Sequence, residues 1–150
     1  MKSRRQFLTL LSATAFVLSA GPTLAQQSVV FTKKGLAIGG YDPVAYFLEA
    51  KPVKGMAEFT SLHDGANFQF SSAANKALFD ADPGSYAPQY GGYCAYAVAN
   101  GYTAKTEPDA WSIHDGKLYL NYSKGVRRTW KKDIPGYISK ADTNWPGVLK

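Results

Sequence analysis

Cysteine is nearly absent from this sequence, because Cys94 is the only one among 150 residues. A single thiol excludes an internal disulfide framework and a cysteine-rich zinc cage. The common catalytic signatures are also missing: there is no nucleophile elbow with ordered Ser, His and Asp partners, no phosphate loop and no dinucleotide fingerprint. An enzyme is therefore the less favoured interpretation, with thiol redox chemistry at Cys94 left open.

Acidic residues are absent before Asp42, whereas Lys2, Arg4 and Arg5 give the opening of the chain a positive charge. The apolar or small residues 7–20 that follow are too few, and too rich in Ser and Thr, to span a bilayer well. A basic start followed by a short apolar run is typical of a signal peptide. A membrane anchor or a buried helix is the alternative interpretation.

The predicted cleavage point follows Ala25, where small residues precede the cut. The signal peptide is then 1–25 and the mature chain is a single domain, 26–150. Ser3-Arg4-Arg5-Gln6-Phe7-Leu8 resembles the twin-arginine export signature, although Thr9 stands where a Lys is usual. A Sec signal with a chance arginine pair is the alternative. The twin-arginine resemblance implies an exported mature protein, expected in the periplasm or beyond, with no membrane attachment after cleavage.

The charge of the chain changes meaning once this signal is set aside. The full sequence has 17 basic and 11 acidic residues, for a net charge of +6. Three of the basic residues and none of the acidic ones lie in the signal, so the mature chain has 14 against 11, or +3. A net charge this small does not indicate a nucleic-acid-binding protein.

The mature chain shows hairpin and short-helix signals without strand–helix–strand alternation, which predicts an α+β fold. Asp42 and Pro43 are suited to begin a helix. Turn residues between alternating segments predict two β-hairpins, and the second contains Asp115-Gly116, which favours a type I′ turn. The hairpins are expected over 58–70, with a turn at 63–66, and over 111–121. The further helices are expected over 73–80, 93–100 and 123–133, and Pro135-Gly136 is expected to separate the last of these from another short helix that runs toward Asn144.

Residues 68–86 and the upstream Asp42-Pro43-Val44 resemble a YHS domain, a small module associated with metal binding. Phe70, Ser72, Phe79, Pro83 and Tyr86 match the pattern of the module. The chain is also similar to exported bacterial YHS-domain proteins, in which a Tyr-Gly-Gly-Tyr-Cys-Ala-Tyr segment, a Trp-containing hairpin and a helical tail follow. The resemblance covers about 42–150 and implies a YHS-like module extended by a second hairpin and C-terminal helices.

The sequence departs from that family at the thiols. Where transporter-type modules carry three cysteines, this chain has Ala45, Ser71 and Asn75. None of these is a soft ligand for Cu(I) or Zn. Metal binding therefore depends on the donors that remain.

The remaining soft or borderline donors are Cys94, His63 and His114, which we take as the candidate metal ligands. Two or three of them together would suit Cu or Zn with an open position. Each also has a simpler interpretation. Cys94 can be a small buried hydrophobe, a redox thiol or one half of an intermolecular disulfide, and each histidine lies beside an aspartate in a hairpin turn.

A second candidate set lies in the segments around Asp42 and Cys94, where tyrosines gather. Asp42, Tyr46, Tyr90 and Tyr93 are the candidate ligand-binding residues, and Gly91-Gly92 would let a ligand approach the backbone. The alternative is a core of hydrogen-bonded tyrosine hydroxyls, with Asp42 as a helix cap.

The sequence thus favours an exported, non-catalytic YHS-type binding module for a metal ion or a metal-bearing ligand. A metal-free scaffold that binds a periplasmic protein partner is the alternative, supported by Ala45, Ser71 and Asn75. A thiol redox enzyme using Cys94 is the third hypothesis.

Overall fold

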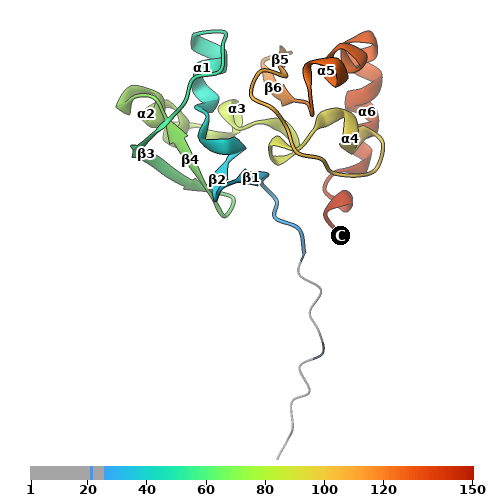
Figure 1. The fold of residues 1–150 in the computed structure, drawn as a ribbon, viewed down its shortest axis with the longest axis horizontal. Helices are drawn as coiled ribbons and strands as arrows, with labels where there is room; N and C mark the ends of the chain where they lie inside the picture. Colours follow the sequence, from blue (N-terminus) through green and yellow to red (C-terminus); the bar gives the residue numbers. More distant parts are fainter. Residues whose placement is uncertain (1–20, 22–25) are drawn as a thin grey trace, which may run out of the picture.

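The computed structural model describes Gly21 and residues 26–150. The predicted signal peptide therefore lies outside the described residues, apart from Gly21. Within the described part of the chain, no helix combines the length and the apolar character that crossing a membrane requires. Two small sheets and several short helices confirm the α+β class. They form two halves that stand side by side, with the N-terminal half in blue and green and the C-terminal half in yellow to red (Figure 1).

The N-terminal half is a four-stranded sheet packed against two helices. The strand order is β1-β2-β4-β3, with β2 and β4 parallel and the other neighbours antiparallel. Its hydrophobic core includes Phe68, Phe70 and Phe79, all nearly inaccessible to solvent. The elements are β1 (Thr32–Lys33), β2 (Leu36–Ala37), η1 (Ile38–Gly40), α1 (Pro43–Leu48), β3 (Met56–His63), β4 (Ala66–Phe70) and α2 (Ala73–Ala81).

The C-terminal half is a hairpin with three helices around Trp130, which is fully buried. Two short turns, α3 (Pro83–Tyr86) and η2 (Gln89–Gly92), connect it to the first half. Its elements are α4 (Ala95–Ala99), β5 (Trp111–His114), β6 (Lys117–Leu120), α5 (Lys124–Trp130), η3 (Lys131–Asp133), α6 (Ile134–Asn144) and η4 (Gly147–Leu149).

Both predicted hairpins are present. In each, the two turn residues have positive φ, at Asp64-Gly65 and at Asp115-Gly116, as a type I′ turn requires. The strands extend slightly further into the first turn than predicted, because His63 pairs with Ala66. The second hairpin pairs Trp111 with Leu120 across its open end.

Some of the observed helices begin where the sequence predicts and others do not. α1 and α2 begin where predicted, each after a side chain that caps it, Asp42 and Ser72. α4 begins at Ala95, two residues later than predicted, since Tyr93 is extended. The expected helix over 123–133 is α5 followed by a 3-10 turn.

The last helix corrects one prediction. Pro135 and Gly136 were expected to separate two helices, but both lie in the first turn of α6. Pro is well tolerated there because the first helical N–H groups have no partner within the helix. The Asp133 carboxylate caps this helix by accepting a hydrogen bond from the Gly136 N–H at 3.1 Å.

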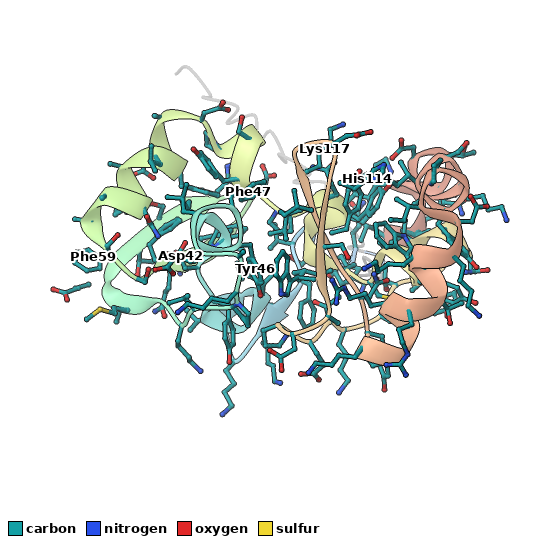
Figure 2. All side chains as sticks on the ribbon, turned by 90° about the horizontal axis from the view of Figure 1, so that it is seen from above. Asp42, Tyr46, Phe47, Phe59, His114 and Lys117 are labelled. Atoms are coloured by element: carbon teal, nitrogen blue, oxygen red, sulfur yellow. The ribbon has the colours of Figure 1, made fainter. Side chains whose placement is uncertain are left out.

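The two halves meet through a third apolar cluster. Ile38 and Tyr46 from the first half pack with Leu118 and Leu120 from the second. Tyr46 extends from α1 toward the other half (Figure 2). Its hydroxyl donates a hydrogen bond to the carbonyl of Pro108, which lies in the loop before β5, at 3.0 Å. Packed side chains from both halves therefore frame this junction.

Candidate functional site

Asp42 is the polar side chain of the N-terminal half that makes the most hydrogen bonds among the described residues. Its carboxylate is fully buried and accepts five hydrogen bonds. Oδ1 accepts from the N–H groups of Val44 and Ala45, at 2.8 and 3.2 Å, and so caps α1. Oδ2 accepts from the Ser71 N–H, the Ser71 hydroxyl and the Asn75 side-chain amide, at 2.8, 2.7 and 2.8 Å. This carboxylate ties α1 to α2 and to the end of β4.

Ser71 and Asn75 are two of the three positions that the YHS resemblance matched to cysteines. Both direct their hydrogens at Asp42, and Asn75 also donates weakly to the Ser71 hydroxyl at 3.4 Å. The third position, Ala45, is buried and offers no side-chain donor. These residues do not fit the soft-metal site of the transporter-type module, because their polar atoms are already engaged with one another.

Cys94 precedes α4 and is almost completely buried. Its thiol donates to the Asn121 side-chain oxygen at 3.5 Å and accepts from the Tyr122 N–H at 3.2 Å. Burial raises the pKa of the thiol above its ordinary value. Neutral thiol is therefore the form present near neutral pH, which opposes nucleophilic chemistry.

The three predicted metal ligands are not brought together. His63 ends β3 in the first half, His114 ends β5 in the second (Figure 2), and Cys94 lies before α4. Each histidine instead faces its neighbouring aspartate, at 3.3 Å for His63–Asp64 and 3.4 Å for His114–Asp115. Within the described residues, no three side chains of the types His, Cys, Asp and Glu form a group that could hold a metal ion.

The tyrosines predicted to bind a ligand use their hydroxyls inside the fold. Like Tyr46 at the junction, Tyr90 and Tyr93 each donate a hydrogen bond to the protein itself. The acceptors are the Asp142 carboxylate, 2.8 Å from the Tyr90 hydroxyl, and the Ser28 carbonyl, 2.7 Å from the Tyr93 hydroxyl. Burial raises the pKa of all three phenols, and in Tyr90 the hydrogen bond to Asp142 raises it further. The geometry is that of the alternative interpretation, a core with hydrogen-bonded hydroxyls.

Gly91 approaches the protein's own chain closely, where the sequence suggested an approach by a ligand. Its φ is +61°, and a Cβ there would overlap the Val29 carbonyl oxygen. The Gly91 carbonyl accepts a hydrogen bond from the Phe31 N–H at 2.9 Å. The missing side chain therefore allows the segment before β1 to lie against η2.

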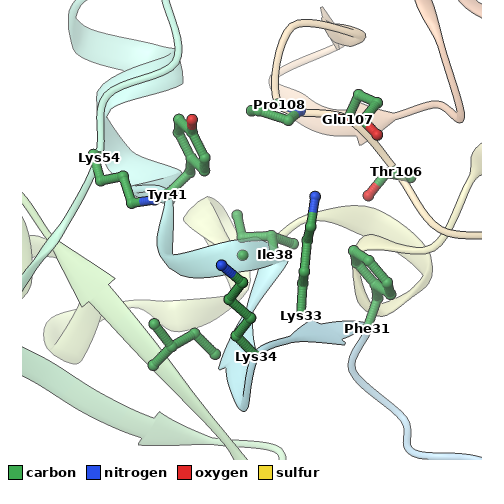
Figure 3. Close-up of a pocket in the computed structure, with 11 residues that line it drawn as sticks. Phe31, Lys33, Lys34, Ile38, Tyr41, Lys54, Thr106, Glu107 and Pro108 are labelled. Carbon is green, nitrogen blue, oxygen red and sulfur yellow. The ribbon is translucent and has the colours of Figure 1, made fainter.

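Among three clefts of similar volume, about 270, 250 and 220 Å³, the first lies at the junction of the two halves. Three lysines, Lys33, Lys34 and Lys54, reach it from the first half, as does the ring of Tyr41. Figure 3 shows Lys33 extending toward the side formed by the loop before β5, with Tyr41 and Lys54 opposite. The remaining lining residues are Phe31, Leu36, Ile38, Gly39, Thr106, Glu107 and Pro108.

This cleft was not predicted from the sequence, because its residues come from three separate segments, 31–41, 54 and 106–108. One local signal was present. Lys34 and Gly35 both have positive φ between β1 and β2, so they form a third turn of the type I′ kind. The other two turns have Asp before Gly, the preferred sequence, whereas this one has Lys.

Comparison of the chain with protein-family models, with curated proteins and with solved structures finds no match in any of the three.

Proposed function

We propose that the protein is an exported, non-catalytic binding module of the YHS type that acts without a metal ion. The observation that carries the proposal is the Asp42 carboxylate with its five hydrogen bonds. It occupies Ser71 and Asn75, so positions that resemble a family's thiol ligands serve here to hold the fold together.

The donors left elsewhere support a metal-free role. Cys94 has an amide oxygen and a backbone N–H as its neighbours, and neither a histidine nor a carboxylate is among its hydrogen-bond partners within the described residues. A Cu or Zn site needs several ligands in a convergent set, and the hydrogen-bond partners of Cys94 are not of that kind.

The same geometry supports a non-catalytic role. A nucleophilic thiol needs an adjacent base or a cationic neighbour that lowers its pKa. The Asn121 amide beside Cys94 can do neither, and burial shifts the thiol pKa upward. A redox role would therefore require chemistry that this environment disfavours.

Metal titration tests the proposal directly. We expect the mature chain, purified without chelator, to contain less than one equivalent of copper or zinc by elemental analysis. We also expect Cys94→Ala to leave Cu(I) and Zn²⁺ titrations unchanged. His114→Ala removes a second of the ligands predicted from the sequence and should likewise leave the same titrations unchanged.

The contrary result is equally clear. One equivalent of bound metal that disappears in Cys94→Ala would overturn the metal-free proposal and support the metal site predicted from the sequence. A separate alkylation titration addresses redox chemistry: we expect Cys94 to react more slowly than a free thiol at neutral pH, and rapid reaction would favour the redox hypothesis.

A further inference from the structure

We propose that the cleft at the junction binds a small organic anion, with the charged group between the lysines and an apolar body against the floor. This inference rests on the proposed function only in treating the protein as a binding module. It names the class of ligand that the cleft would take.

The charge of the cleft favours an anion. Lys33, Lys34 and Lys54 bring three positive charges, and within the described residues none of the three forms an ion pair. Glu107 is the one acid that lines the cleft, and it faces Lys105 at 3.6 Å. The lining therefore carries a net charge of +2, three lysines less one glutamate.

The floor of the cleft favours a ligand that has more than a charge. Phe31, Leu36 and Pro108 are half-buried and Ile38 is buried, which leaves apolar surface beneath the ammonium groups. The ring of Tyr41 adds an aromatic wall on the side of Lys54 (Figure 3). A bare inorganic ion would leave this apolar surface uncovered, whereas an aromatic or branched organic anion would cover it.

The β1–β2 turn fixes the backbone of two of the three lysines, Lys33 and Lys34. Lys33 pairs with Leu36 across the β1–β2 turn, and Lys34 lies at the first positive-φ position of that turn. A lysine is an unfavourable choice there, since Asn or Asp fits the left-handed conformation better. The other two turns keep the preferred Asp at this position, and only the turn at the cleft has a lysine instead. A binding role for Lys34 would explain this exception.

The cleft also joins the two halves of the protein. Its residues Thr106, Glu107 and Pro108 belong to the loop before β5, and the Pro108 carbonyl accepts the hydrogen bond of Tyr46. A ligand held between Lys33 and this loop contacts both halves at once. Binding is therefore expected to raise the melting temperature.

Isothermal titration calorimetry at low ionic strength tests the inference on residues 26–150, which contain every described helix and strand. The probes are phenyl phosphate, benzoate, inorganic phosphate and neutral benzyl alcohol. We expect phenyl phosphate or benzoate to bind more tightly than inorganic phosphate, and benzyl alcohol to show no binding. Comparing the first two probes shows whether the charged group is a phosphate or a carboxylate.

Charge-reversal variants locate the site. The double variant Lys33→Glu with Lys54→Glu is expected to weaken binding of the organic anion at least about tenfold. The matched control, Lys131→Glu with Lys132→Glu, makes the same change in net charge on exposed residues of η3 and is expected to leave affinity within about twofold. Circular dichroism is used to check that both variants are folded.

Three outcomes would overturn the inference: no anion binds at low salt, both double variants weaken binding equally, or inorganic phosphate binds as tightly as the organic anions. Because these titrations are made on metal-free protein, their failure is distinct from failure of the proposed function, which would appear as bound copper or zinc.

Discussion

Two short helices, α1 and α4, begin in opposite ways, and the contrast explains how each half is held. α1 is capped by its own preceding residue, since Asp42 accepts from two N–H groups of the first turn. α4 follows Cys94, whose side chain provides no such cap. Its Tyr96 N–H is instead satisfied by Asn121, 25 residues later in the chain.

The other end of α4 also depends on a distant residue. The Asn144 side chain, in α6, donates to the carbonyls of Val98 and Ala99 at 2.9 and 3.2 Å. Side chains from outside α4 thus contribute hydrogen bonds at both of its ends, and at its C-terminus the N–H groups of Gly101 and Tyr102 add local ones. A carboxylate next to a helix stabilises it locally, whereas a helix that follows a thiol depends on tertiary contacts.

The largest effect in this comparison is expected at Asp42. Asp42→Ala removes a buried acceptor, leaves the donors of Ser71 without it and leaves the Asn75 amide with only its weak bond to Ser71, so the free energy of unfolding should fall by about 3 kcal/mol or more. Urea denaturation followed by circular dichroism measures it. Asp133→Ala, which removes the exposed cap of α6, is the matched control and should cost about 1 kcal/mol. Equal losses would show that Asp42 is only a helix cap.

A smaller loss is expected at Asn121, which supports α4 from the end of β6. Asn121→Ala removes the acceptor for Tyr96 and Cys94, but it also removes a buried side-chain nitrogen that has no partner among the described residues. The two effects oppose each other, so the free energy of unfolding should fall by about 1–2 kcal/mol. The same denaturation experiment applies. A loss as large as that of Asp42→Ala would contradict the contrast between the two helices.

The smallest effect is expected at Cys94 and depends on pH. Its folded-state pKa lies above the unfolded value of 9.0, so the neutral thiol contributes stability that is fully present below about pH 9. That stability is lost as pH rises through the folded pKa. Between about pH 9 and 10.5, the free energy of unfolding should therefore fall less steeply with pH in Cys94→Ala than in the unchanged protein. Identical slopes would show that the thiol does not titrate differently on folding.

Local chemistry explains which parts of the fold could be predicted. The start of α1 follows from Asp42-Pro43, and the second hairpin from Asp115-Gly116, because each signal is contained within neighbouring residues. The start of α4 was placed two residues early because the side chain that satisfies it, Asn121, is remote in sequence. The contacts of a buried side chain with distant partners cannot be obtained from periodicity or propensity.

The same reasoning applies to the candidate site. Asp42 was identified as a cap and a candidate ligand-binding residue, but its bonds to Ser71 and Asn75 cross 29 and 33 residues. The lysine cleft requires three segments to meet, and only the unusual Lys34-Gly35 turn marked it in the sequence. Cys94, which was singled out by its rarity, lies in an environment that keeps it neutral.

The segment that Gly91 accommodates has a consequence for the topology of the chain. In the segment that lies against Gly91, the Gln27 N–H donates a hydrogen bond to the Leu149 carbonyl at 3.3 Å. The two ends of the folded body therefore touch (Figure 1). The described chain is therefore almost a closed loop. A short linker between residues 150 and 26, with new termini opened at the exposed turn of Asp115 and Gly116, should give a circular permutant that preserves both halves and the cleft between them.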